Sequence, residues 1–244
     1  MQASFSVREE AGHTLKSAIT HTAELDLMNG AKTRGADLSL TTELAGLGGN
    51  VHHVRAQASA SYARPLPFST ALHFSLRGGR LLPLPSDTLA RVAWPAAAHG
   101  DAVRVRPGIA DRFFLGGAGD VRGFAQHGIG PRVADDALGG DAFWASAVRF
   151  TLPFPYRPVR ALVGDALRVH VFANAGSLTG VVPGEATSAW TARLRTDVAA
   201  AWGVGLTARL AFAVLELNYC VPLLVPARSC PAPGVQFGIG VNYL

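Results

Sequence analysis

The stretch from Asp111 to Arg132 carries the residues best suited to a chemical or binding role. It holds six glycines, three arginines and three phenylalanines, and it follows neither a strand period nor a helix period. Glycines at this density open backbone conformations that other residues avoid, and they raise the entropy lost when the segment is ordered. An ordered loop of this kind needs firm contacts with its surroundings, and Arg122 offers five hydrogen-bond donors for them. The alternative is an exposed surface loop.

Motifs for enzymatic chemistry are missing from the rest of the sequence. The loop lacks the G-x-x-x-x-G-K-[ST] pattern of a phosphate cradle, and neither G-x-S-x-G nor H-E-x-x-H occurs. The acidic pair Asp135-Asp136 is best interpreted as part of a solvated loop. His52 and His53 are adjacent, so on a strand they face opposite sides and cannot bind one metal ion together. We therefore expect no enzymatic activity, no cofactor and no metal site.

The composition excludes several classes of protein. Of the 244 residues, 49% are apolar and 16% are charged, which gives the chain enough apolar surface to bury and argues against disorder. The sequence contains no run of eighteen apolar residues, so it predicts no membrane-spanning helix. The net charge of +5 is carried mostly by arginines scattered singly, so we expect no nucleic-acid partner. Cys220 and Cys230 fit no zinc spacing, and we expect two unpaired thiols, with a bridge between them as the alternative.

Apolar and polar residues alternate with period two, most sharply near the C-terminus. Apolar residues at the odd positions from Val235 to Tyr243 alternate with glutamine, glycine and asparagine, and the segment from Val198 to Thr207 repeats the pattern. A soluble sandwich would carry charges on its outer face, whereas a second face of small and polar residues suits the wet lumen of a membrane barrel. The periodicity favours an all-β transmembrane antiparallel barrel, with a soluble β-sandwich as the alternative.

Ten strands are predicted, separated by glycine- and proline-containing turns. The segment 85–110, which is rich in proline, alanine and arginine, is assigned to no element. The predicted strands cover residues 2–8, 14–28, 34–46, 50–63, 70–84, 141–152, 166–175, 197–208, 211–221 and 234–243.

The loop sequence resembles the signature loop of the outer-membrane barrel-assembly superfamily. The resemblance is carried by Phe114-Leu115-Gly116-Gly117, then Val121-Arg122-Gly123-Phe124, then Ile129-Gly130-Pro131. The run from Leu138 to Trp144 is similar to the mitochondrial branch, the central barrel subunit of the sorting and assembly machinery. Weaker similarities at Val171–Gly176 and Leu215–Tyr219 extend the match almost from end to end.

The resemblance implies a sixteen-stranded barrel in which the glycine-rich loop folds back into the lumen. This chain would supply about ten C-terminal strands, so residues 1–244 are expected to form one outer-membrane β-barrel domain. That domain would be incomplete at its N-terminal side and would have no N-terminal domain that receives polypeptides.

The family's functional residues transfer to the loop and to the wall that faces it. Arg122 matches the arginine that contacts polar groups on the inner wall, and the expected loop motif is Val121, Arg122, Gly123 and Phe124 with Gly116 and Gly117. Where many bacterial relatives carry an acid, this chain has Asn174, and a contact there would be a hydrogen bond weaker than an ion pair. The possible wall partners of the loop are Asn174, Asp141 and Glu216, and the choice among them is left open.

The last predicted strand resembles the sorting signal at the end of mitochondrial barrel proteins, through Gln236, Gly238, Val241 and Tyr243. The resemblance implies that the protein inserts and assembles β-barrel precursors in the mitochondrial outer membrane, by strand pairing at a lateral seam. The implied partners are the lipid bilayer, barrel precursors, metaxin-type accessory subunits and the cristae-organising complex. The alternatives are a passive outer-membrane pore, or a non-functional or regulatory fragment of the insertase.

Overall fold

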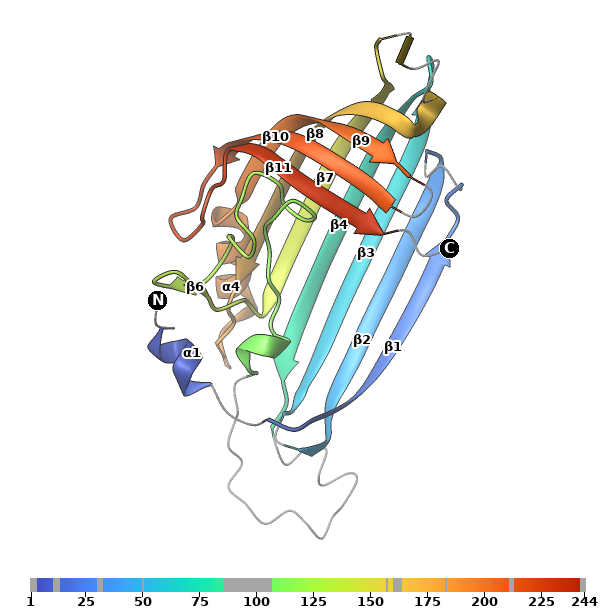
Figure 1. Ribbon diagram of the computed structural model, residues 1–244. Helices are drawn as coiled ribbons and strands as arrows, with labels where there is room; N and C mark the ends of the chain where they lie inside the picture. Colours follow the sequence, from blue (N-terminus) through green and yellow to red (C-terminus); the bar gives the residue numbers. More distant parts are fainter. Residues whose placement is uncertain are drawn as a thin grey trace.

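Nine antiparallel strands form one curved sheet whose order follows the chain (Figure 1). The computed structural model describes residues 4–10, 14–29, 33–49, 51–85, 107–156, 158–159, 164–182, 184–210 and 213–241. The nine strands are β1 (Lys16–Asp26), β2 (Gly35–Gly49), β3 (His53–Leu66), β4 (Thr70–Pro83), β7 (Ala142–Pro153), β8 (Leu167–Thr179), β9 (Ala199–Arg209), β10 (Ala213–Leu224) and β11 (Gly234–Val241). Within these ranges β1 and β11 pair with no further strand, so the sheet is not closed.

Alternation along each strand separates two faces of the sheet. On β11 the side chains of Val235, Phe237 and Ile239 are 70%, 57% and 64% exposed, and they point away from the concave side. The intervening Gln236 and Gly238 face inward, opposite Asn218 and Glu216 of β10. Leaving large apolar side chains on the outside and polar ones on the inside is the pattern of a barrel wall against lipid. The prediction of an antiparallel all-β fold is confirmed.

The long connection between β4 and β7 lies within the curve of the sheet (green in Figure 1). Its described part holds the 3-10 helix η2 (Ile109–Asp111) and a small hairpin of β5 (Arg132–Val133) and β6 (Asp136–Ala137). The apolar core of the molecule lies between this connection and the inner wall, because loop residues pack on side chains of the strands. The buried cluster comprises Phe113, Leu115, Val121, Phe124 and Ile129 of the loop with Leu81, Phe143, Ala145, Leu178, Ala199 and Ala201 of the wall.

The predicted strand at residues 2–8 is wrong. Residues Phe5–Glu9 form the short helix α1, whereas residues 1–3 lie outside the described ranges. The segment is fastened to the loop and finds no strand to pair with among the described residues. The backbone N–H of Ser4 donates to Asp136 Oδ2 at 2.6 Å, and Glu10 Oε1 lies 3.4 Å from Arg112 Nη2. A lone strand without a partner leaves its backbone groups unpaired, which a helix avoids.

The other nine predicted strands are all present, with boundaries within four residues of the prediction. The helix α4 (Thr187–Thr196) and the 3-10 helix η3 (Gly164–Ala166) lie in connections where the sequence predicted no element. No helix in the described ranges combines the length and the apolar character needed to cross a membrane. Of the unassigned segment 85–110, residues 86–106 lie outside the described ranges.

Candidate functional site: the loop tip on the inner wall

The tip of the loop, Val121 to Phe124, is packed tightly against the inner wall. Val121 and Phe124 are 1% and 0% exposed. Gly123 has φ +88°, and a Cβ added there would lie 2.7 Å from the Cβ of Ala201 on β9. Both the left-handed backbone and the close approach require glycine at this position. The turn that precedes the tip is closed by Gly117 N–H donating to the carbonyl of Val121 at 3.2 Å.

Arg122 reaches a carboxylate on the wall and shares it with a second arginine. Its Nη2 donates to Glu216 Oε2 of β10 at 2.6 Å, and Arg149 Nη1 of β7 donates to Glu216 Oε1 at 2.7 Å. The guanidinium carbon of Arg122 also lies 5.0 Å from the ring centroid of Phe172 on β8. Arg122 is 8% exposed, and the charge-assisted bond and the ring contact compensate in part for the water that it has lost, while its buried Nε has no hydrogen-bond partner in the described residues.

Two amide side chains hold the backbone of the tip on either side of this ion pair. In the orientation that satisfies both of its amide atoms, Asn174 Oδ1 of β8 accepts from Arg122 N–H at 2.8 Å. Gln236 of β11 accepts from Gly123 N–H at 3.0 Å and donates through Nε2 to the carbonyl of Phe124 at 3.1 Å. Three successive residues of the tip are thus fixed by side chains from β8, β10 and β11.

The three possible partners named from the sequence take different roles. Glu216 binds the guanidinium of Arg122, and Asn174 binds its backbone. Asp141 contacts neither group. It lies at the base of the loop, where its Oδ2 accepts from Val181 N–H at 2.8 Å and its residue is 3% exposed.

A second ion pair supports the turn before the tip. Asp120 pairs with Arg77 of β4, and its Oδ2 accepts from Gly116 N–H at 3.0 Å. A cavity of about 420 Å³ lies beside these groups, and Arg77, Arg122 and Arg149 line it together with His73. The lumen next to the loop tip is therefore a basic, partly filled space.

The motif expected at the C-terminal end is only partly described. Gln236 and Gly238 lie on β11 with their positions facing inward, and Val241 is the last described residue of that strand. Tyr243 lies outside the described residues. Cys220 and Cys230 are both free, as the sequence predicts.

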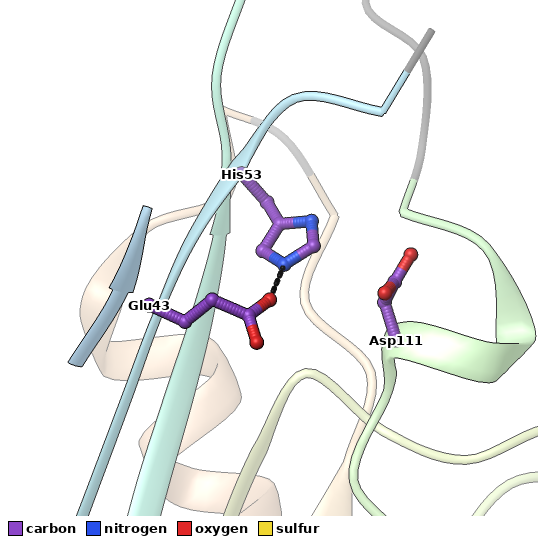
Figure 2. A group of neighbouring side chains, drawn as sticks. All are labelled: Glu43, His53 and Asp111. Carbon is purple, nitrogen blue, oxygen red and sulfur yellow. Dashed lines mark hydrogen bonds and ion pairs between the residues drawn. The ribbon is translucent and has the colours of Figure 1, made fainter. Parts of the chain in front are cut away.

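A group of polar side chains at the other end of the loop brings three possible metal ligands together (Figure 2). His53 Nε2 lies 2.9 Å from Glu43 Oε1, and Asp111 of η2 faces them. The Lys16 ammonium, however, lies 2.6 Å from Glu43 and 2.7 Å from Asp111. Because this cation already bridges the two carboxylates, we interpret the group as an ion-pair network that fastens the base of the loop to β1, β2 and β3.

Arg149, Arg77 and Lys16 were not singled out from the sequence as site residues. A signal for Arg149 was available, because it lies on the same strand face as Ala145 and Ala147 in a segment that alternates. An arginine in such a row marks a wet, inward face. The sequence carries no comparable signal for the Asp120 pair.

Comparisons with known proteins agree with this geometry. A family profile described as the Omp85 superfamily domain matches residues 2–243. The chain is 41% identical to sorting and assembly machinery component 50 homolog B of Xenopus laevis and 38% identical to the Homo sapiens homolog. In both cases the match covers 99% of this chain and 49% of the relative. The chain thus spans about half the length of the curated relatives that it matches.

A solved structure shares the fold. BamA from Haemophilus ducreyi lacking POTRA domains 1–3 aligns with 92% of this chain and 42% of its own, at a TM-score of 0.68 and 16% identity. This likeness shows that the curved sheet shares the fold of the corresponding part of that protein. Because the family profile covers nearly the whole chain and the fold agrees, the protein belongs to the Omp85 superfamily.

Proposed function

We propose that this chain forms part of the machinery that inserts and assembles β-barrel precursors in the mitochondrial outer membrane. The observation that carries the proposal is the fixed loop tip, in which Arg122 is bound by Glu216 while Gln236 of the last strand holds the next two residues. Relatives named as components of the sorting and assembly machinery support it.

The proposed mechanism is exchange of strand pairing at a lateral seam. β11 is paired with β10 along one side, and its other side is an edge within the described ranges. In hydrocarbon each unsatisfied backbone group costs several kcal/mol, so an incoming strand that pairs as another leaves keeps the barrier low. Since Gln236 joins this strand to the loop tip, the loop stabilises the position of the edge. The scheme needs no nucleotide and no cofactor.

The proposed partners follow from this mechanism and from the resemblance. They are the outer-membrane bilayer, barrel precursors that carry a C-terminal strand, metaxin-type accessory subunits and the cristae-organising complex. The last strand of this chain, through Gln236, Gly238, Val241 and Tyr243, would also mark it as a substrate of the same machinery.

Insertion of a barrel precursor into liposomes tests the proposal. The chain is reconstituted, a radiolabelled precursor is added, and the folded, protease-resistant fraction is compared with that of protein-free liposomes. We expect insertion above background, and we expect Arg122→Ala to lower the rate at least tenfold. The matched control is Arg228→Ala, which removes the same charge from an exposed turn.

The alternatives give different results in the same liposomes. A passive pore would conduct ions without inserting precursor, and Arg122→Ala would leave its conductance unchanged. A regulatory fragment would neither insert precursor nor conduct, but would bind the accessory subunits. Either result would contradict the insertase proposal.

A further inference from the structure

Arg80 lies on the outer, lipid-facing side of β4. Its neighbour Leu81 is 1% exposed and packs inward with the loop, so Arg80 must point to the opposite face. Leu76 and Leu82 share that outer face and are 56% and 42% exposed. A charged side chain in such an apolar row is unfavourable against lipid unless it lies near the interface or has a partner.

Helix α4 covers this part of the wall from outside. Trp144 Nε1 of β7 donates to the carbonyl of Leu194 at 3.0 Å, and Arg193 Nε donates to Thr179 Oγ1 of β8 at 3.1 Å. Trp144 and Thr179 lie on the outer face, because the intervening positions of β7 and β8 point to the loop. Ser177, which is also on that face and lies opposite Trp144, is 0% exposed. The helix therefore lies on the outside of the sheet, at the start of β7 and the end of β8.

The first half of α4 brings an indole ring onto Arg80. The guanidinium carbon of Arg80 lies 4.6 Å from the ring centroid of Trp190. Arg80 Nε and Trp190 Nε1 are both shielded from water, and neither has a hydrogen-bond partner in the described part of the chain. Both groups are donors and cannot accept, so the same place holds two buried donors that lack an acceptor. These two atoms are closed to an outside group, but the Nη groups of Arg80 are not among the buried atoms and have no hydrogen-bond partner in the described residues, so an anionic oxygen can reach them.

The nearby carboxylate does not fill this role. Glu185 lines the same cavity as Arg80, but its oxygens are engaged by the guanidinium of Arg193 and by Val182 N–H. The Arg193 hydrogen bonds lower the pKa of Glu185 to about 2, which keeps it ionised and committed to that partner. The positive charge of Arg80 is thus left for a group from outside.

Two hollows on the outer face flank the arginine. One, of about 280 Å³, adjoins Arg80 at the loop end of β4, between Leu82 and Val182. The other, of about 710 Å³, lies next to Gly78, which is two residues before Arg80 on β4 and on the same outer face. It exists because small outward residues leave a depression between large ones, and its outward lining comprises Ala23, Leu25, Leu38, Leu40, Ala58, Ala60, Leu76, Gly78 and Trp144. The two hollows are separate, but Arg80 beside one and Gly78 beside the other occupy successive outward positions of β4.

We propose that Arg80, held against the Trp190 ring, binds the phosphate of an anionic phospholipid in the leaflet on the loop side, with an acyl chain in the hollow beside Gly78. The headgroup phosphate accepts from the Nη groups of Arg80, and the acyl chain fills the hollow that small residues leave. Tryptophan is enriched at membrane interfaces, and Trp144 near the start of β7 and Trp190 on α4 both lie at this end of the wall. The inference depends on the outer wall facing lipid and is independent of precursor insertion.

The full chain in mixed vesicles tests this site. Phosphatidylcholine vesicles contain a small, varied fraction of phosphatidylglycerol whose acyl chains are brominated, and quenching of tryptophan fluorescence reports its binding. We expect saturable quenching, and we expect Arg80→Gln to weaken the apparent affinity about tenfold, the loss of one charge-assisted interaction. Arg195→Gln removes the same charge from an exposed position on α4 and should change the affinity less than twofold.

Further arms separate the site from its alternatives. Arg80→Lys keeps the charge and should bind better than Arg80→Gln. The lysine variant also tests the site if the glutamine variant folds poorly. Trp190→Leu removes the ring that holds the Arg80 guanidinium, and native mass spectrometry should show weaker retention of phosphatidylglycerol. The proposal is overturned if Arg80→Gln and Arg195→Gln behave alike, or if brominated phosphatidylcholine quenches equally at the same fraction. Displacement of the lipid by millimolar inorganic phosphate would assign the site to free phosphate instead.

Discussion

At the scale of single residues, the site depends on one carboxylate that serves two arginines. Glu216 lies between Arg122 of the loop and Arg149 of the wall, with donor distances of 2.6 and 2.7 Å. Its side chain is 15% exposed, so water screens the three charges only in part. Removing the carboxylate would leave two like charges facing each other in a confined space, which costs more than the pair itself contributes.

Substitution of Glu216 by glutamine should therefore destabilise the fold measurably. We expect Glu216→Gln to lower the free energy of unfolding by roughly 2–3 kcal/mol, at the lower end for a broken buried pair because the lumen is partly wet. Urea unfolding of the refolded chain in micelles measures the change. Glu24→Gln on β1 neutralises an exposed carboxylate and should have little effect. Equal midpoints for the two variants would show that Glu216 is not a structural partner of the loop.

Gly123 gives a second residue-scale prediction. We expect Gly123→Ala to cost roughly 2–3 kcal/mol, because alanine is strained at φ +88° and its Cβ would meet the Cβ of Ala201 at 2.7 Å. Gly119→Ala is the matched control, since nothing lies within 4 Å of the added Cβ there. Thermal unfolding compares the two. Adding Ala201→Gly should recover part of the loss in Gly123→Ala, and no recovery would mean that the contact with β9 is unimportant.

At the scale of elements, the Gln236 side chain attaches the loop to the last strand. Gln236 of β11 accepts from Gly123 N–H and donates to the carbonyl of Phe124. The backbone adds further bonds to the β10–β11 connection, including Ala125 N–H to the carbonyl of Cys230 at 3.0 Å. Movement of β11 away from β10 would therefore pull on the loop tip, so the edge strand and the loop are mechanically coupled.

Hydrogen exchange of the loop tests this coupling. We expect Gln236→Ala to raise the exchange rate of the Gly123 amide about tenfold, since it removes the acceptor and one further hydrogen bond of about 1 kcal/mol. The amides of β7 and β8, which do not contact Gln236, should keep their rates. Ser39→Ala, which removes an inward polar side chain on β2, provides the control. Unchanged exchange at Gly123 would mean that the backbone bonds alone hold the tip.

At the scale of the whole molecule, the chain is a curved wall with its core on the concave side. A soluble sheet of this size would bury apolar side chains on the face that packs against another layer. Here the apolar core is restricted to the loop and the few wall residues that it touches, while large apolar residues on the convex face remain exposed. This distribution is stable only where lipid covers the convex face. The same reasoning makes an arginine on that face, Arg80, a site that needs a partner.

Alternation with period two, together with turn signals, predicted nine of the structure's strands, and where the alternation is sharp, as from Val235 to Tyr243, it also predicted the two faces. It was wrong for residues 2–8, because a strand needs a neighbour and the segment from Ser4 to Glu10 binds the loop instead. Helix α4 was not predicted, because its residues carry no clear apolar stripe and its position depends on contacts with Trp144 and Thr179.

The sequence by itself determined the antiparallel sheet and its inward polar face through local periodicity, while the place of Arg122 at the tip of the glycine-rich loop came from the resemblance to the barrel-assembly superfamily. Only the tertiary structure decided which wall residue binds Arg122. Glu216 lies 94 residues further along the chain, Asp141 offered the same carboxylate chemistry, and Asn174 offered a weaker hydrogen bond. Alternation predicts which face of the sheet a residue occupies, but it does not predict which inward residues the loop contacts. The packing of Val121, Gly123 and Phe124 against the wall, including Ala201 of β9, decides which inward residues lie beside the loop tip.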